Sequence, residues 1–261
     1  MVIIDPPRLA GFKVREAYFP TADEVWRLAE ELPPFTTVRA RQAGELARPH
    51  RRQIKHNPTT TLVADLTRPA DEVFGRMSKS TRNLVSRARR TPGVRVAMNG
   101  QSACSDFLTL HNEFVAEKRF TGPLSHATLN AHLAACDVAV AYLDDDPICG
   151  LVVLRDPTVR RALPVYSATT RLRAEGDYDK HAGRLYRYLF WHLMQHYQAA
   201  GMELFDFGGI WSENDSIGQF KRSLGGEPLH EHNYAFAGPL VHLALRVHRL
   251  PAVQAVRMRF A

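Results

Sequence analysis

Long apolar runs are absent from this sequence of 261 residues. No stretch approaches the roughly 20 consecutive apolar residues that a membrane-spanning helix needs. The N-terminus, MVIIDPPRLAGFK, also lacks the basic segment followed by an apolar one that is typical of a signal peptide. We therefore expect a soluble, cytoplasmic protein with no stable membrane insertion.

Cysteine is scarce as well, with three residues in the chain, Cys104, Cys136 and Cys149. An odd number without a C-x-x-C pair indicates reduced thiols rather than a disulfide framework. Cys149 lies in the apolar run from 148 to 154, so we interpret it as a core residue rather than a nucleophile.

Several catalytic signatures are missing too. The sequence has no G-x-S-x-G nucleophile elbow and no phosphate-binding P-loop. His192 and His196 have the i, i+4 spacing of a zincin helix but lack its glutamate. We predict no metal site and no bound cofactor.

Basic residues are plentiful. Lysine and arginine number 34 against 27 aspartates and glutamates, which gives a formal net charge of +7. They gather in three segments, 48–56, 76–90 and 246–259. A polyanion such as tRNA, a nucleotide or an anionic membrane surface would complement this charge, and an inert basic surface is an equal alternative.

The order of predicted elements indicates an α+β domain, in which three consecutive strands form an antiparallel meander. The expected helices are 21–32, 69–91, 102–118, 125–136, 183–200 and 215–224, with a tail helix from Pro239. The expected strands are 61–66, 94–98, 137–143, 148–154, 162–168, 203–207 and 229–236. Residues 40–57 have no apolar period, so we expect an exposed basic loop there.

Two motifs narrow the function: FDFGG at 205–209 and GQFKRSLGGEP at 218–228. They resemble the C-terminal hallmark of Fem-type transferases, which move an amino acid from aminoacyl-tRNA onto a peptide. The segments 61–96 and 149–170 resemble the same family. The resemblance implies a GNAT-like acyltransferase fold, with a mixed, mainly antiparallel central sheet flanked by helices. It further implies a reduced N-terminal remnant of a first GNAT-like domain (1–60), a transferase domain (61–237) and a basic helical tail (238–261).

The same resemblance implies that Phe220 and Lys221 contact the aminoacylated end of the tRNA, and the alternative is that Phe220 is a core residue and Lys221 is solvated. Lys221 would stabilise the oxyanion or the departing ribose oxygen, and Phe220 would hold the terminal adenosine of the tRNA. Tyr166 is expected to relay a proton or bind the acceptor. Asp206 would orient a substrate amine or Lys221, or else cap the next turn.

A second group of residues is expected to bind the substrates. The residues predicted to contact the tRNA backbone are Lys79, Arg82, Arg87, Arg90 and Arg222. The residues predicted around the transferred group and acceptor are Gly208, Gly209, Asn214 and Arg119. Family members that bind nucleotide-linked cell-wall precursors carry an arginine after the segment that matches Arg119-Phe120, and this chain has TGPLSHATLNAH there. We therefore expect a small peptide or natural-product amine, as in antibiotic biosynthesis, rather than a peptidoglycan precursor.

The donor is the remaining question. Acyl-CoA enzymes of GNAT type carry a Gln/Arg-x-x-Gly-x-Gly/Ala loop whose amides cradle a pyrophosphate. Residues 178–186 contain one glycine, Gly183, and no such pattern, which favours aminoacyl-tRNA as donor. Two alternatives stay open: an acyl-CoA-dependent N-acyltransferase, and a catalytically silent RNA-binding or partner-binding module on the same fold.

Overall fold

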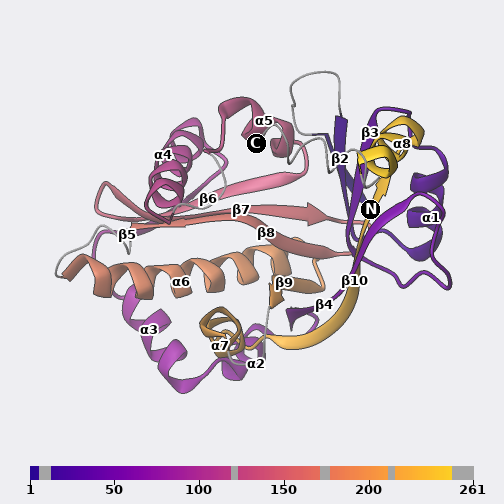
Figure 1. The fold of residues 1–261 in the computed structure, drawn as a ribbon. Helices are drawn as coiled ribbons and strands as arrows, with labels where there is room; N and C mark the ends of the chain where they lie inside the picture. Colours follow the sequence, from indigo (N-terminus) through magenta and orange to yellow (C-terminus); the bar gives the residue numbers. More distant parts are fainter. Residues whose placement is uncertain (6–12, 119–122, 171–176, 211–214, 249–261) are drawn as a thin grey trace. The chain divides into compact units, whose positions relative to one another are not determined.

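A computed structural model describes residues 1–5, 13–118, 123–170, 177–210 and 215–248 (Figure 1). The chain divides into two compact units, one made of Met1–Thr59 with His230–Ala261 and the other of Thr60–Leu229. Residues 230–237, which the sequence analysis assigned to the transferase domain, thus belong to the same unit as the N-terminal segment.

The smaller unit contains a sheet and two helices. Its elements are β1 (Val2–Ile4), β2 (Lys13–Tyr18), α1 (Ala22–Glu30), β3 (Thr36–Ala43), the end of β10 (Glu227–Ala237) and α8 (Pro239–His248). β2 and β3 run parallel, whereas β10 runs antiparallel to β3. The predicted first helix is confirmed: the Thr21 hydroxyl accepts the Glu24 N–H at 3.3 Å, and the Glu24 carboxylate accepts the Thr21 N–H at 2.8 Å. This reciprocal cap fixes the start of α1.

The expected loop at 40–57 is wrong at both ends, because β3 extends to Ala43 and β4 begins at Gln53. In β3, buried Val38 and Ala40 alternate with Arg39 and Arg41. Both arginines pair with Glu16 of β2, at 3.4 and 3.3 Å. Their carboxylate partner is distant in sequence, so the basic residues gave no local sign of a strand.

The larger unit is a six-stranded sheet in the order β4-β9-β8-β7-β6-β5. Its strands are β4 (Gln53–Asp65), β5 (Val94–Met98), β6 (Cys136–Leu143), β7 (Asp146–Asp156), β8 (Arg161–Thr169) and β9 (Leu204–Ile210). Its helices are α2 (Ala70–Arg76), α3 (Lys79–Arg89), α4 (Gln101–Lys118), α5 (His126–Leu133), α6 (Asp177–Ala199) and α7 (Ser216–Ser223). All neighbouring strands of this sheet pair antiparallel except β8 and β9, which are parallel. The predicted meander and the mixed, mainly antiparallel sheet are confirmed.

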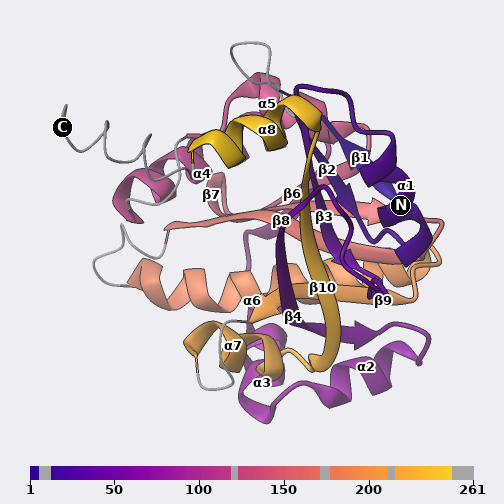
Figure 2. The same cartoon turned by 45° about the vertical axis from the view of Figure 1, so that its right-hand side comes forward.

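Helices cover both faces of this sheet. α4 and α5 lie on one face, and α6 lies on the other with α3 packed against it (Figures 1 and 2). The long or kinked helix expected over 69–91 is two helices, because Ser78 begins a new helix by accepting the Thr81 N–H at 3.2 Å. The helix expected to reach residue 136 ends at Leu133, since Cys136 already belongs to β6.

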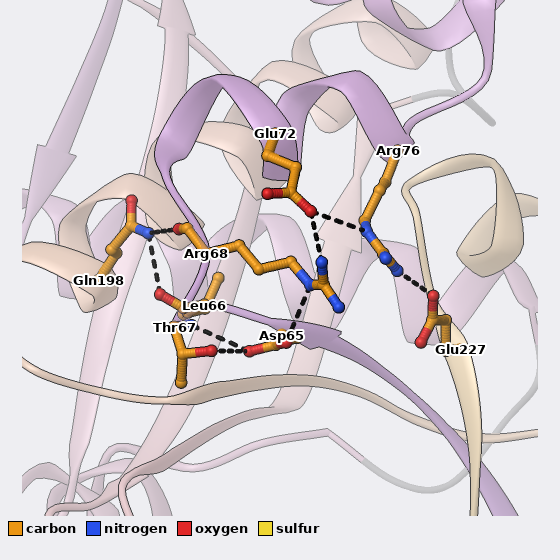
Figure 3. Close-up of polar contacts among 8 residues, drawn as sticks. All are labelled: Asp65, Leu66, Thr67, Arg68, Glu72, Arg76, Gln198 and Glu227. Carbon is orange, nitrogen blue, oxygen red and sulfur yellow. Dashed lines mark hydrogen bonds and ion pairs between the residues drawn. The ribbon is translucent and has the colours of Figure 1, made fainter.

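A polar network holds the end of β4 against two helices (Figure 3). Gln198 of α6 donates to the carbonyl oxygens of Leu66 at 2.9 Å and Arg68 at 2.6 Å. The Arg68 guanidinium binds Asp65 at 3.0 Å and also Glu72. These contacts fix the turn that leads from β4 into α2.

Two of the three cysteines are buried, and Cys104 is half-buried. Cys149 is fully buried in the core, and burial raises the pKa of its thiol. Cys136 is also buried, which raises its pKa to about 12. Such thiols are poor nucleophiles at neutral pH. Within the residues that the structure describes, every helix is too short or too polar to span a bilayer.

Candidate active site

The site is built where the pairing of β8 and β9 ends. These strands are in register only at Arg161 with Leu204 and Ala162 with Phe205. Pro164, two residues on, has no N–H to give to a neighbouring strand. A bulge follows it, because Val153 of β7 pairs with Pro164 whereas Val152 already pairs with Tyr166. Beyond this point the described residues of β8 and β9 are no longer paired.

β9 carries a bulge of its own, at the FDFGG motif. Thr61 of β4 pairs with Gly209 but Val63 pairs with Asp206, so the register shifts between them. Gly208 has φ +82°, a conformation that L side chains rarely adopt. The Asp206 carboxylate accepts the Gly208 N–H at 2.6 Å and so holds the turn.

Asp206 itself is fully buried in an ion pair. Its Oδ2 accepts Arg161 Nε at 3.1 Å and Nη2 at 2.5 Å, and its Oδ1 accepts the Thr61 hydroxyl. The Arg161 side chain is only 7% exposed. These contacts make Asp206 a positioning residue for the β9 bulge. Its expected action on a substrate amine stays a prediction.

Lys221 of α7 reaches this bulge. Its Nζ donates to the carbonyl oxygens of Gly208 at 3.0 Å and Gly209 at 2.7 Å. Successive carbonyls of a regular strand point in opposite directions, and the positive φ of Gly208 is what lets both converge on one ammonium. An ammonium has three N–H donors, so one is left without a partner among the described residues.

Burial lowers the pKa of the Lys221 ammonium, and the negative charges of Asp206 and Asp215 oppose part of that shift. A buried ammonium is a stronger acid than one in water. Lys221 is therefore suited to donate a hydrogen bond, or a proton, to an oxygen that gains negative charge.

The glycines of the second motif fix the end of α7. The Gly225 N–H donates to the Arg222 carbonyl at 2.9 Å, and the Gly226 N–H donates to the Lys221 carbonyl at 3.2 Å. With φ +89° at Gly225, this is a Schellman cap. A Cβ at Gly226 would lie 2.9 Å from the Lys221 carbonyl oxygen and 3.0 Å from Leu62 Cβ, so this position has no room for a side chain.

Phe220 anchors the other side of α7. Its ring stacks on Tyr186 at 5.6 Å and meets Phe190 edge-on at 5.7 Å. The Arg187 guanidinium lies 4.9 Å from the ring centroid. Phe220 therefore holds α7 on α6 and presents Lys221 to β9, and its contact with an adenosine stays a prediction.

Tyr166 lies on the face of β8 that carries α4 and α5. Its ring packs edge-on against His111 of α4 at 5.6 Å and His132 of α5 at 5.3 Å. The buried His132 has Nδ1 2.7 Å from the Thr128 carbonyl, which assigns the proton to Nδ1. Nε2 then accepts the Tyr166 hydroxyl at 3.4 Å.

Leu163 lies on the same face of β8 as Tyr166 and close to Gly208. Leu163 pairs with Leu154 and Tyr166 with Val152, so both residues of β8 point to the same face. A Cβ at Gly208 would lie 3.5 Å from Lys221 Nζ and 3.9 Å from Leu163 Cδ1.

The predicted tRNA contacts do not form one set. Arg82 donates to the carbonyl oxygens of Gly75, at 2.8 Å, and Met77, so it caps the end of α2. Arg76, which begins the basic segment, pairs with Glu72 and Glu227 (Figure 3). The predicted contacts whose side chains are exposed on and just after α3 are Lys79, Arg87 and Arg90. Arg222 is half-buried on α7.

Two predicted substrate residues, Asn214 and Arg119, lie outside the residues that the structure describes. The sequence analysis did not single out two residues that the structure places at the site, Arg161 and His132. Arg161 begins β8 directly after Arg160, the last residue of a turn, so the local sequence does not distinguish it from a surface arginine. The carboxylate within the FDF strand does indicate that a cation must pair with it. In the described ranges, no three His, Cys, Asp or Glu side chains are grouped as metal ligands.

Comparisons with known proteins agree with this architecture. The structure resembles FemX, with a TM-score of 0.54 at 10% identity over 67% of this chain and 61% of FemX. It resembles the C-terminal domain of a putative lysylphosphatidylglycerol synthetase from Agrobacterium fabrum, with a TM-score of 0.56 at 16% identity over 89% and 81% of the two chains. It also resembles L-PGS from Bacillus licheniformis, with a TM-score of 0.54 at 12% identity over 93% and 84%.

At these identities the structural similarities establish the fold alone, and the chain spans only about three fifths of FemX. A search of curated protein sequences found no significant match. The family profile establishes the family, because the Acetyltransferase (GNAT) domain matches residues 75–222, which is more than half of the chain and includes Lys221. The GNAT-like α+β fold is confirmed, and this chain belongs to the Acetyltransferase (GNAT) domain family.

Proposed function

We propose that this acyltransferase moves an amino acid from aminoacyl-tRNA to the amine of a small peptide or natural-product acceptor, and that Lys221 is its principal catalytic residue. The observation that carries the proposal is the Lys221 ammonium, which is partly desolvated and held by two glycine carbonyls of β9, beyond the point where the pairing of β9 with β8 ends. The similarity in fold to FemX, to the C-terminal domain of a putative lysylphosphatidylglycerol synthetase and to L-PGS supports the choice of an aminoacyl donor.

The chemistry asks for charge stabilisation. A neutral acceptor amine attacks the ester carbonyl, an amide bond forms, and the ester bond to the ribose oxygen breaks. The remaining N–H of Lys221 stabilises the developing oxyanion or the departing ribose oxygen. Because the ester is already activated, orienting the two substrates supplies much of the remaining rate acceleration.

One proton must leave the attacking amine and one must reach the ribose oxygen. Tyr166 offers a route for the first, since its hydroxyl faces the lone pair of His132 Nε2. The lowered pKa of Lys221 suits it to the second. The two groups would then act on opposite sides of the tetrahedral intermediate.

The RNA contact is assigned to the exposed side chains near α3. Lys79, Arg87 and Arg90 would bind the phosphate backbone without reading sequence. Arg222, on α7 beside Lys221, would contact the phosphates nearest the aminoacylated end. Arg82 takes no part in this contact, because its guanidinium caps α2.

A second candidate function is transfer from an acyl-CoA, which the description of the matched family favours. A mass-spectrometric assay separates the two. Purified protein is given charged total tRNA and a panel of short peptides and amines, with and without ribonuclease, and acyl-CoAs in parallel. We expect the acceptor to gain the mass of one amino-acid residue in a ribonuclease-sensitive way. A product formed with acyl-CoA alone would replace the proposal by the second function.

A further inference from the structure

Helix α7 (Ser216–Ser223) presents the side chain of Ile217 to solvent, and this residue is 53% exposed. Single exposed apolar residues are common on protein surfaces, so the position of Ile217 matters more than its exposure. Ile217 precedes Lys221 by four residues. Residues at this spacing lie on the same face of a helix, with their Cβ atoms about 5–6 Å apart. An apolar side chain therefore lies beside the residue to which we assign the oxyanion.

The Lys221 side chain extends toward Ile217. In an α-helix, long side chains point back toward the N-terminus and over the residues three and four positions earlier. For Lys221 these residues are Gly218, which has no side chain, and Ile217. Asp215, whose carboxylate caps the start of α7, is close enough for its charge to act on the ammonium. The ammonium therefore lies near the first turn of α7, which contains Ile217.

The proposed reaction brings the acyl group of the donor to this place. The oxygen that Lys221 would stabilise is bonded to the ester carbonyl carbon, and the Cα of the transferred amino acid is bonded to the same carbon. The amino-acid side chain begins one bond further on. It must therefore lie close to the ammonium, within reach of Ile217.

Other groups at the reaction centre are less suited to contact an isoleucine. The ribose of the donor and the acceptor amine are polar where they meet the carbonyl carbon, and the tRNA backbone is anionic. Burying such groups against an apolar side chain costs free energy unless they are hydrogen-bonded. An aliphatic or aromatic amino-acid side chain gains free energy from the same contact, because both apolar surfaces leave water.

We propose that Ile217 is a specificity-determining residue that contacts the side chain of the transferred amino acid, and that the enzyme prefers donors with an apolar aminoacyl group. This inference rests on the proposed aminoacyl transfer and on Lys221 as the oxyanion donor. It adds to that function the class of amino acid that is carried.

The test compares donors that differ in the amino acid alone. One tRNA is acylated with leucine or with alanine, and kcat/KM is measured for each with the wild type and with Ile217→Ser, using the same panel of acceptors. One methylene in an apolar pocket is worth roughly tenfold or more in kcat/KM, so the wild type should prefer leucine by at least that factor. Ile217→Ser should lower the leucine-to-alanine ratio by about tenfold and leave transfer of alanine nearly unchanged.

Two control variants accompany this comparison. Ile217→Leu keeps an apolar side chain and should retain the preference for leucine. Val159→Ser changes an exposed apolar residue in the turn between β7 and β8, and it should retain the preference as well. Thermal unfolding checks that all three variants fold.

The outcomes separate this inference from the proposed function. Equal kcat/KM of the wild type for leucine and alanine, or an unchanged ratio in Ile217→Ser, would overturn the inference alone. A changed ranking of acceptors at an unchanged leucine-to-alanine ratio would also overturn it, and would assign Ile217 to the acceptor. Absence of transfer from every aminoacyl-tRNA would overturn the proposed function and this inference together.

Discussion

Replacing Arg161 with methionine removes the cation that accompanies a fully buried carboxylate. The Asp206 carboxylate is 0% exposed, and two nitrogens of Arg161 bind its Oδ2. Methionine fills much of the arginine stem but brings no donor. Asp206 then keeps only the Thr61 hydroxyl and the Gly208 N–H of the hydrogen bonds described above.

Removing one partner of a buried ion pair costs about 3–5 kcal/mol, because the other charge stays behind without compensation. For a chain of this size 1 kcal/mol corresponds to roughly 2–4 °C in Tm, so Arg161→Met should lower Tm by about 6–20 °C. The matched control is Arg15→Met. Arg15 pairs with Asp5 at 2.9 Å, but the two side chains are 38% and 59% exposed, and such a pair contributes at most about 1 kcal/mol.

Urea unfolding of the two variants and of Arg161→Met/Asp206→Asn measures these differences. The double variant should lose less than the sum of its single variants, since removing the second charge relieves the first loss. If Arg161→Met unfolds within 1 kcal/mol of the wild type, the buried-charge argument fails.

Three further changes probe the site. Gly226→Ala should lower Tm markedly, because a Cβ there meets atoms at 2.9–3.1 Å. The control Gly75→Ala, where a Cβ meets no atom within 4 Å, should leave Tm unchanged or raise it. Equal Tm values for the two variants would refute the steric argument. The transfer rate should fall as pH rises, at a pH below 10.5, the ordinary pKa of lysine, because the active ammonium of Lys221 loses its proton at its lowered pKa. A transfer rate that falls only above pH 10.5 would contradict this. Tyr166→Phe and His132→Phe should each lower kcat about 10²–10⁴-fold with little change in KM, and unaltered kcat would exclude the proton route.

Elements governed by short-range rules were predictable. The Thr21 cap, the meander of β6 to β8 and the position of α7 all follow from signals within a few residues. The strand end at Ala43 was missed because Arg39 and Arg41 depend on Glu16, which is distant in sequence. The break at Ser78 was missed because a serine inside an amphipathic run is compatible with a continuous helix.

The residues of the candidate site also fall into a predictable group and an unpredictable one. Lys221 and Gly208 stand out in their motifs, and the structure brings them together at 3.0 Å. Arg161 is 45 residues from Asp206 in sequence, and His132 is 34 residues from Tyr166, so neither partner could be chosen without the fold. The sequence can show that a buried polar group needs a hydrogen-bonding partner, but the identity of that partner depends on the fold.

The most direct test of the account is single-turnover transfer by Lys221→Met at saturating aminoacyl-tRNA, with Arg222→Met as the matched control. Removal of one oxyanion donor typically costs about 10²–10³-fold in rate. We predict a loss of that size for Lys221→Met with an unchanged Tm. For Arg222→Met we predict a near wild-type rate and weaker, less salt-dependent tRNA binding. A Lys221→Met enzyme that transfers at the wild-type rate would contradict the central claim.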